Sequence, residues 1–134
     1  MICVAAMLAQ AAAVQNGLLH IQGGGWESWV TPQFPAGVSG WFAAVLEYSA
    51  EEVGSLPVVT LEVADHEGHD AGFKASTIIE LNRVPGAPPE SPRRVPVAIP
   101  FALAVTQPGQ FSVRLSDSSG VLSSIDILVV QRRA

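Results

Sequence analysis

Apolar side chains occur at every second position in several stretches of this chain. Phe111, Val113 and Leu115 alternate with polar residues, and residues 59–63 follow the same pattern. A β-strand that packs by one face has this period of two, whereas a helix repeats every 3.6 residues. Strands of this kind are typical of antiparallel sheets with one buried face. The pattern therefore predicts an all-β fold.

The other β-rich segments bring the expected number of strands to about eight. They span residues 18–22, 41–49, 73–81, 95–103 and 121–130. In the fourth of these, Pro96 and Pro100 remove backbone donors, which predicts an edge strand. Residues 1–14 contain six alanines, which favour a helix, but their larger apolar residues alternate, so we expect a strand and then a turn. The whole pattern predicts an antiparallel two-sheet sandwich, immunoglobulin-like or C2-like.

Glycine and proline mark the expected turns. Asn16-Gly17 and Ser119-Gly120 favour tight hairpin turns, which need positive φ. The glycines at 23–25 lack the Gly-Lys-Ser/Thr of a phosphate-binding loop, so we expect a bulge or bend that carries the chain from one sheet to the other. The proline-rich stretch 84–94 is expected to connect the two sheets. Because the strands after it are too few for a separate core, residues 1–134 are expected to be one domain.

The charge of the chain argues against binding to nucleic acid. Twelve acidic and seven basic side chains give a formal net charge of −5, which repels phosphate backbones. Residues 1–70 contain no Lys or Arg, so their net charge is negative, whereas the rest of the chain has a net positive charge. Either the strands mix these charges in the fold, or two faces of opposite sign dock on each other or on a charged partner.

The first residues favour a cytoplasmic location. Residues 1–9 are apolar, but no Lys or Arg precedes them as in a secretory signal, and a membrane-spanning helix needs about 20 apolar residues. Cys3 is the single cysteine and makes no internal disulfide. We expect no membrane association.

Four parts of the chain together resemble a known family. They are residues 8–12, residues 16–26, the turn 65–68 and residues 108–111. The family consists of short, uncharacterised bacterial proteins, known only as a domain of unknown function, that fold as small β-sandwiches. The Gly-Gly-Gly-Trp at 23–26 is the most specific part, while Gln10 stands where that family usually carries Asp and Pro100 where a polar residue is common. The resemblance spans the whole chain and implies a fold without any chemistry.

One cluster contains side chains that could bind a metal ion. Asp65, His66, Glu67, His69 and Asp70 lie within six residues. The two histidines are three apart, a spacing that converges on a helix face but diverges on a strand, and Gly68 favours a turn. We therefore expect a solvated hairpin turn with exposed histidines and no bound metal or other cofactor.

No catalytic constellation stands out in the sequence. The three histidines, at 20, 66 and 69, are not accompanied by the Gly-x-Ser-x-Gly of a nucleophile elbow. Glu51 and Glu52 are adjacent in an expected loop, where their carboxylates diverge. We expect no catalytic residues and no enzymatic activity.

The tryptophans form the candidate interaction surface. Trp26, Trp29 and Trp41 lie in the part of the chain that is richest in aromatic residues. Three interpretations stay open for them: packing in the core, contact with a partner or a second copy, and stacking on a sugar ring. Emission of the tryptophans that shifts on dilution would indicate a subunit interface.

These observations favour a non-enzymatic protein-binding or self-assembly module. Apolar residues make up 49% of the chain and charged residues 14%, a surplus that favours self-association through an edge strand or an aromatic face. We expect a homo-oligomer or a protein partner. The first alternative is a small metal-dependent protein or enzyme that uses residues 65–70, and the second is a carbohydrate-binding module.

Overall fold

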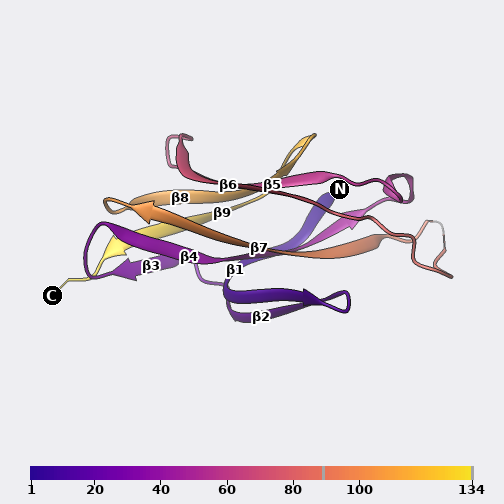
Figure 1. Ribbon diagram of the computed structural model, residues 1–134, viewed down its shortest axis with the longest axis horizontal. Coiled ribbons are helices and arrows are strands. Elements are labelled where there is room, and N and C mark those ends of the chain that lie inside the picture. Colours follow the sequence, from indigo (N-terminus) through magenta and orange to yellow (C-terminus); the bar gives the residue numbers. More distant parts are fainter. Residues whose placement is uncertain (89, 134) are drawn as a thin grey trace.

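Nine strands form two β-sheets in the computed structural model, which describes residues 1–88 and 90–133 (Figure 1). The four-stranded sheet has the order β2 (Leu18–Gly24), β1 (Ile2–Gln15), β4 (Ala36–Tyr48) and β7 (Arg93–Val105). The five-stranded sheet has the order β3 (Ser28–Thr31), β9 (Gly120–Gln131), β8 (Gly109–Asp117), β5 (Val58–Asp65) and β6 (Asp70–Ile78). The described residues include no α-helix, only the 3-10 turn Ala50–Glu52. The all-β prediction is confirmed.

The strand prediction was wrong in one detail, the pairing of β3. The described residues form nine strands where about eight were predicted, and the additional one is the short β3, which lacks the alternating pattern. β3 also pairs in parallel with β9, Trp29 opposite Val129, so the sheets are not antiparallel throughout. The N-terminal segment is a strand followed by a turn, as predicted. None of the helices in the described part of the chain has the length and apolar character needed to span a membrane.

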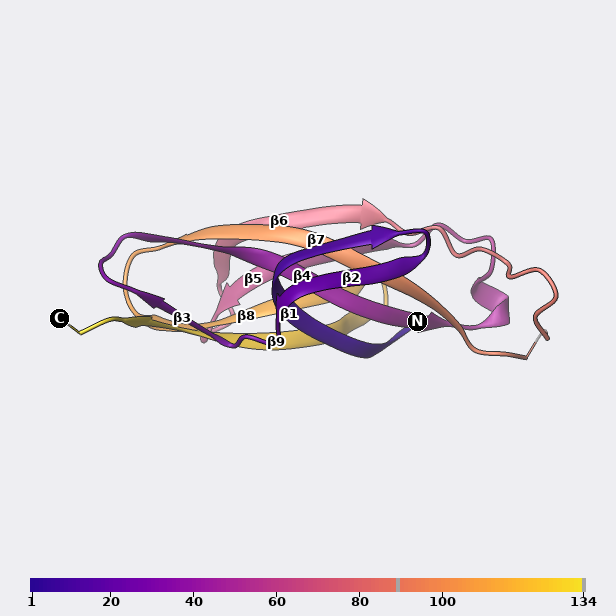
Figure 2. The same ribbon diagram turned by 90° about the horizontal axis from the view of Figure 1, so that it is seen from below.

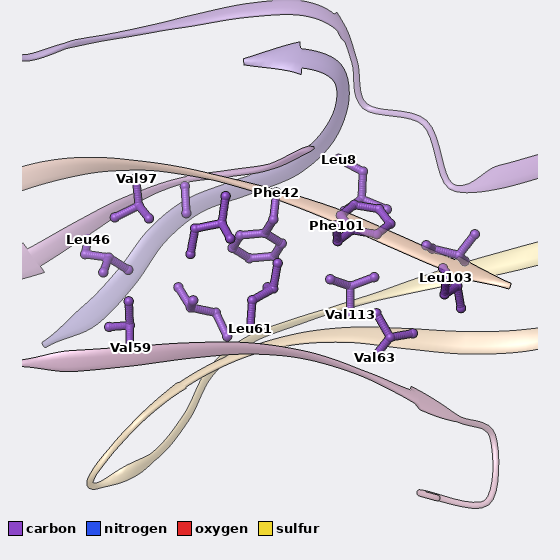
Figure 3. Close-up of a cluster of buried hydrophobic side chains, with 14 of the residues drawn as sticks. Leu8, Phe42, Leu46, Val59, Leu61, Val63, Val97, Phe101, Leu103 and Val113 are labelled. Atoms are coloured by element: carbon purple, nitrogen blue, oxygen red, sulfur yellow. The ribbon is translucent and has the colours of Figure 1, made fainter. Parts of the chain in front are cut away.

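The hydrophobic core lies between the two sheets (Figure 3). Phe42 on β4 and Leu61 on β5 are fully buried there, together with Val113 and Leu115 on β8. Leu61, Val113 and Leu115 alternate along their strands with more exposed residues, as the sequence predicted, whereas Phe42 is followed by the buried Ala43. Burial of one such side chain is worth about 1.5–3 kcal/mol relative to exposure. The buried apolar side chains of these strands therefore hold the two sheets together.

The prolines of β7 lie where the sequence placed them. β7 ends its sheet, and Pro96 and Pro100 pair with Val45 and Trp41 of β4. Proline has no backbone N–H. An edge strand tolerates it because the N–H groups that point to solvent make no hydrogen bond to a neighbouring strand. The predicted edge strand is confirmed.

Glycine conformations explain the connections. Asn16 and Gly17 both have positive φ, at 53° and 73°, and close the hairpin between β1 and β2 as predicted. At the β8–β9 turn the prediction was wrong by one residue: the loop is Ser118-Ser119, and Gly120 (φ 135°) already begins β9. The side chain of Asp117 accepts hydrogen bonds from both the backbone N–H and the hydroxyl of Ser119, which stabilises this turn without a left-handed serine.

The two predicted crossings between the sheets are confirmed. The glycines at 23–25 connect β2 of one sheet to β3 of the other, with Gly23 at φ 60° and Gly25 at φ 89°. The stretch 84–94 connects β6 to β7, again from one sheet to the other. Pro89 of that stretch lies outside the described residues.

Charges of opposite sign are mixed between neighbouring strands. Glu62 on β5 lies opposite Lys74 on β6 and Arg114 on β8, and Arg94 Nε is 3.3 Å from a carboxylate oxygen of Glu47. Acidic residues of the first half thus face basic residues of the second half. At these positions the structure supports the interpretation in which the fold mixes the charges.

Candidate interaction surface

A two-stranded hairpin projects from the four-stranded sheet. β1 pairs with β4 only as far as Ala9, which lies opposite Trp41. From Ala9 to Gln15 β1 pairs instead with β2. β1 and β2 therefore form a ribbon, the β1–β2 hairpin (residues 9–24), whose outer strand is β2 (Figure 1).

The hairpin lies across the outer face of its own sheet. Both of its strands contact β7, from which β4 separates them in the sheet order, and Figure 2 shows the ribbon over β4 and β7. Ala9, Ala12 and Ala43 are buried but do not belong to the central core. Small side chains thus pack in a second layer outside the core, so the hairpin is held in place.

The hairpin exposes apolar side chains and carries no charged ones. Leu18 is 63% exposed, Val14 43% and Ile21 37%. The first acidic or basic side chain of the chain is Glu27, so residues 1–26 include no Asp, Glu, Lys or Arg. Leu18 lies on one face of the hairpin and Val14 and Ile21 on the other, and exposed apolar surface without charges is typical of a segment that contacts another protein.

Within the described part of the chain, no strand lies beside the outer edge of β2. β2 ends the sheet order. The two-residue turn at 16–17 makes Gln15 and Leu18 the first hydrogen-bonded pair of the hairpin, so the bonded pairs continue at His20 and Gln22. The N–H and C=O groups of Leu19 and Ile21 therefore point away from β1, toward the open edge.

The strands at the other three ends of the sheet orders carry features that disfavour pairing with a further strand. β7 contains Pro96 and Pro100. β6 has a register irregularity opposite Val63 and Ala64 and exposes the charged Lys74. β3 has only four residues. Proline, charge, bulges and short length are the usual protections of an edge, and β2 between Leu18 and Gln22 has none of them.

The three tryptophans predicted as an interaction surface lie near the base of the hairpin: Trp26 and Trp29 follow it in the chain, and Trp41 lies opposite Ala9. Trp26 and Trp29 pack against the central core, with ring centroids 5.8 Å apart, and the Trp26 ring is 6.3 Å from that of Phe101. Trp41 is half-buried on β4. The structure brings Trp26 and Trp29 together, on the segment that follows the hairpin. The signal that could have revealed the hairpin surface is the lack of charge in residues 1–26 on both sides of an Asn-Gly turn.

The metal-ligand candidates lie around the β5–β6 turn. Asp65 Oδ1 accepts backbone hydrogen bonds from Glu67 and His69, at 3.0 and 2.8 Å. These bonds, above all the one from His69, hold the pKa of Asp65 below its ordinary value despite an opposing effect of burial. His66 and His69 are exposed, and His69 Nδ1 lies 3.5 Å from Asp65. Within the described residues no three His, Cys, Asp or Glu side chains are arranged to hold a metal ion.

A cleft of about 580 Å³ lies between the β5–β6 turn and the β7–β8 turn. Asp65, His66 and Asp70 line one side, and Gln107 and Phe111 line the other. The side chains of Asp65 and Asp70 already accept backbone hydrogen bonds around the turn. We assign it no chemistry.

Glu51 and Glu52 lie in the 3-10 turn after β4. Burial raises the pKa of Glu52, but the backbone N–H of Ser49 and the N-terminal ammonium outweigh it and hold the pKa below the ordinary value. The ammonium lies 3.0 Å from the Glu52 carboxylate. Glu52 is thus engaged in capping the turn and in an ion pair.

Comparison with known proteins identifies a family without assigned activity. The model of a "Family of unknown function (DUF6941)" matches residues 4–130. No curated protein matches the chain. One solved structure that is similar to this chain is "The crystal structure of glycosyl hydrolase family 2 (GH2) member from Bacteroides cellulosilyticus DSM 14838". Its sequence identity to this chain is 16%, and the TM-score is 0.42. That match covers 70% of this chain but 13% of the other, and a likeness at this level carries no argument.

Proposed function

We propose that this chain, which belongs to the family of unknown function DUF6941, is a non-enzymatic protein-binding or self-assembly module that uses the β1–β2 hairpin as its contact surface. We place it in the cytoplasm, as a single domain over residues 1–134. The observation that carries the proposal is one hairpin on which exposed apolar side chains, Leu18 on one face and Val14 and Ile21 on the other, coincide with the lack of charge and an open strand edge.

Each of these three properties supports a protein partner in a different way. Leu18 and Val14 are exposed, and a partner that covers them stabilises the complex by about 25 cal/mol per Å² of apolar surface buried. The open backbone groups of Leu19 and Ile21 can extend the sheet, which is how many peptides and strands bind. The uncharged surface lets a partner approach without the loss of hydration that buried charges suffer. Trp26 and Trp29, in contrast, already pack against the core.

We also propose that the two sheets form an immunoglobulin-like sandwich. β1, β4 and β7 follow one another in one sheet, and β9, β8, β5 and β6 in the other. Without β2 and β3, this is the strand order A-B-E against G-F-C-C′ of immunoglobulin-type folds. In this scheme β2 is an insertion after the first strand. The inserted strand is the one that the proposal assigns to binding.

A photo-crosslinking amino acid placed in the hairpin tests the proposed function. It replaces Leu18 in one variant and Leu56 in a matched control, since these leucines are 63% and 61% exposed and only the first lies on the hairpin. Illumination in the cells that produce the protein should give a defined adduct with a protein, either another copy or a different one, at position 18 only. Equal adducts at both positions, or none at position 18, would contradict the proposal.

A further inference from the structure

We propose that the partner on the β1–β2 hairpin is a second copy of this chain, whose β2 pairs antiparallel with β2 across a two-fold axis at His20. This inference rests on the proposed function and names its partner. It predicts a continuous sheet in which β2 of one copy lies beside β2 of the other. Such an isologous contact is the commonest arrangement of homo-oligomers.

The open backbone groups allow one register only. In an antiparallel pair, residues whose N–H and C=O face the partner form hydrogen-bonded pairs, and on β2 these are Leu19 and Ile21. An axis at His20 pairs Leu19 with the partner's Ile21, and Ile21 with the partner's Leu19. An axis at Ile21 would place Leu19 opposite the partner's Gly23, whose φ of 60° interrupts the strand. An axis at Leu19 would place Ile21 opposite the turn residue Gly17.

The side chains fit the same register. Leu19 and Ile21 share one face of the hairpin with their β1 partners Val14 and Ala12, so pairing brings apolar side chains of both copies together on that face. On the other face His20 lies opposite the partner's His20. This pair is not hydrogen-bonded through the backbone, and its Cα atoms are about 4.5 Å apart.

The charge distribution favours a second copy as the occupant. Each copy has a formal charge of −5, so two copies repel each other unless they meet on a surface without acidic groups. Residues 1–26 supply such a surface, because they contain no Asp, Glu, Lys or Arg. A basic partner would find no carboxylate on the hairpin to bind. Among the four strands that end the sheet orders, β2 is also the one that lacks protection against pairing with an identical strand.

Charge-swap variants at His20 test the two-fold axis. His20 is exposed, so His20→Lys and His20→Glu are expected to fold, which circular dichroism can verify. Sedimentation or light scattering over a range of concentrations should show a dimer for the unchanged chain. Each variant alone places like charges opposite each other and should raise the dissociation constant about tenfold or more. An equal mixture of the two variants should restore the dimer.

Gln22 provides the matched control. In the proposed register Gln22 lies opposite the partner's Leu18, about 13 Å along the strand from the partner's Gln22. Gln22→Lys and Gln22→Glu should therefore weaken the dimer less than the His20 variants, and mixing them should not strengthen it.

A disulfide tests the same axis. In a Cys3→Ser background, His20→Cys should form an intermolecular disulfide under oxidation, because about 4.5 Å between Cα atoms suits that bond. Gln22→Cys should not form one.

Three results would overturn the inference. They are a chain that stays monomeric at all concentrations, His20 variants that dimerise like the unchanged chain, and a mixture that shows no restoration. A protein adduct at position 18 that contains a different protein, together with a monomeric chain, would leave the proposed function standing and refute only the second copy as partner.

Discussion

Gly40 lies where a single added methyl group tests how the tryptophans pack. Gly40 is buried on β4, between the hairpin and the aromatic residues of the core. A Cβ at this position would lie 2.6 Å from Cζ2 of Trp26, 3.0 Å from the carbonyl oxygen of Ala9 and 3.4 Å from Cζ of Phe101. The first neighbour is a rigid ring held by other aromatic rings, and the second is backbone. Neither can move away at little cost.

Gly40→Ala is therefore expected to lower the free energy of unfolding by about 1–3 kcal/mol, the usual cost of overpacking a core. With a urea dependence of about 1–3 kcal/mol per molar for small proteins, the midpoint should fall by roughly 1 M. Urea unfolding followed by circular dichroism measures this. Gly37→Ala is the control, because Gly37 lies on the same strand and a Cβ there has no atom within 4 Å.

The control should be neutral or slightly stabilising, since alanine restricts the unfolded chain more than glycine does. Trp26→Phe should then cost less free energy in the Gly40→Ala background than in the unchanged chain, because the smaller ring leaves room for the methyl group. Equal stability of Gly40→Ala and Gly37→Ala would refute the packing of Trp26 against β4.

Three further predictions concern the tryptophans, the β8–β9 turn and the β5–β6 turn. Emission of Trp26 and Trp29, measured in a Trp41→Phe variant, should be blue-shifted and independent of protein concentration, because both rings pack against the core; a red shift on dilution would place them in a subunit interface. Burial raises the pKa of Asp117, but its hydrogen bonds from Ser119 outweigh this and hold the pKa below the ordinary 3.8. The ionised carboxylate of Asp117 thus stabilises the fold at pH values above 3.8, and this stabilisation is lost as the pH falls through the lowered pKa. Asp117→Asn should therefore reduce the loss of unfolding free energy at acid pH, as measured by urea unfolding at several pH values. An unchanged pH dependence would argue against this role. Calorimetry of metal-stripped protein with zinc should show no site of micromolar affinity, and a site that is lost in His66→Ala with His69→Ala would prove this wrong.

Alternation made most strands predictable. Val59, Leu61 and Val63 all point into the core, and the prolines of β7 mark an edge. Both features act locally, through side-chain direction and a missing donor, so they can be deduced without knowledge of the rest of the chain. The Asn16-Gly17 turn is predictable for the same reason.

Features that depend on distant contacts were not predictable. β3 exists because the glycines at 23–25 bring residues 28–31 beside β9, and its own four residues show no pattern. The burial of Trp26 depends on the space that Gly40 leaves on another strand. The change of β1 from β4 to β2 at Ala9 likewise follows from the pairing of three strands. The sequence therefore directed attention to the tryptophans, whereas the exposed apolar side chains that we propose for binding lie on the hairpin.

Amide hydrogen exchange of β2, measured by NMR at low and at high protein concentration, tests the central claim most directly. The amides of Leu18 and His20 bond to β1 within one copy and should be protected at both concentrations. The amides of Leu19 and Ile21 face the open edge and should become protected only at high concentration, when a second β2 covers them. Exchange of Leu19 and Ile21 that stays fast at every concentration would contradict the claim that β2 is the contact surface between copies.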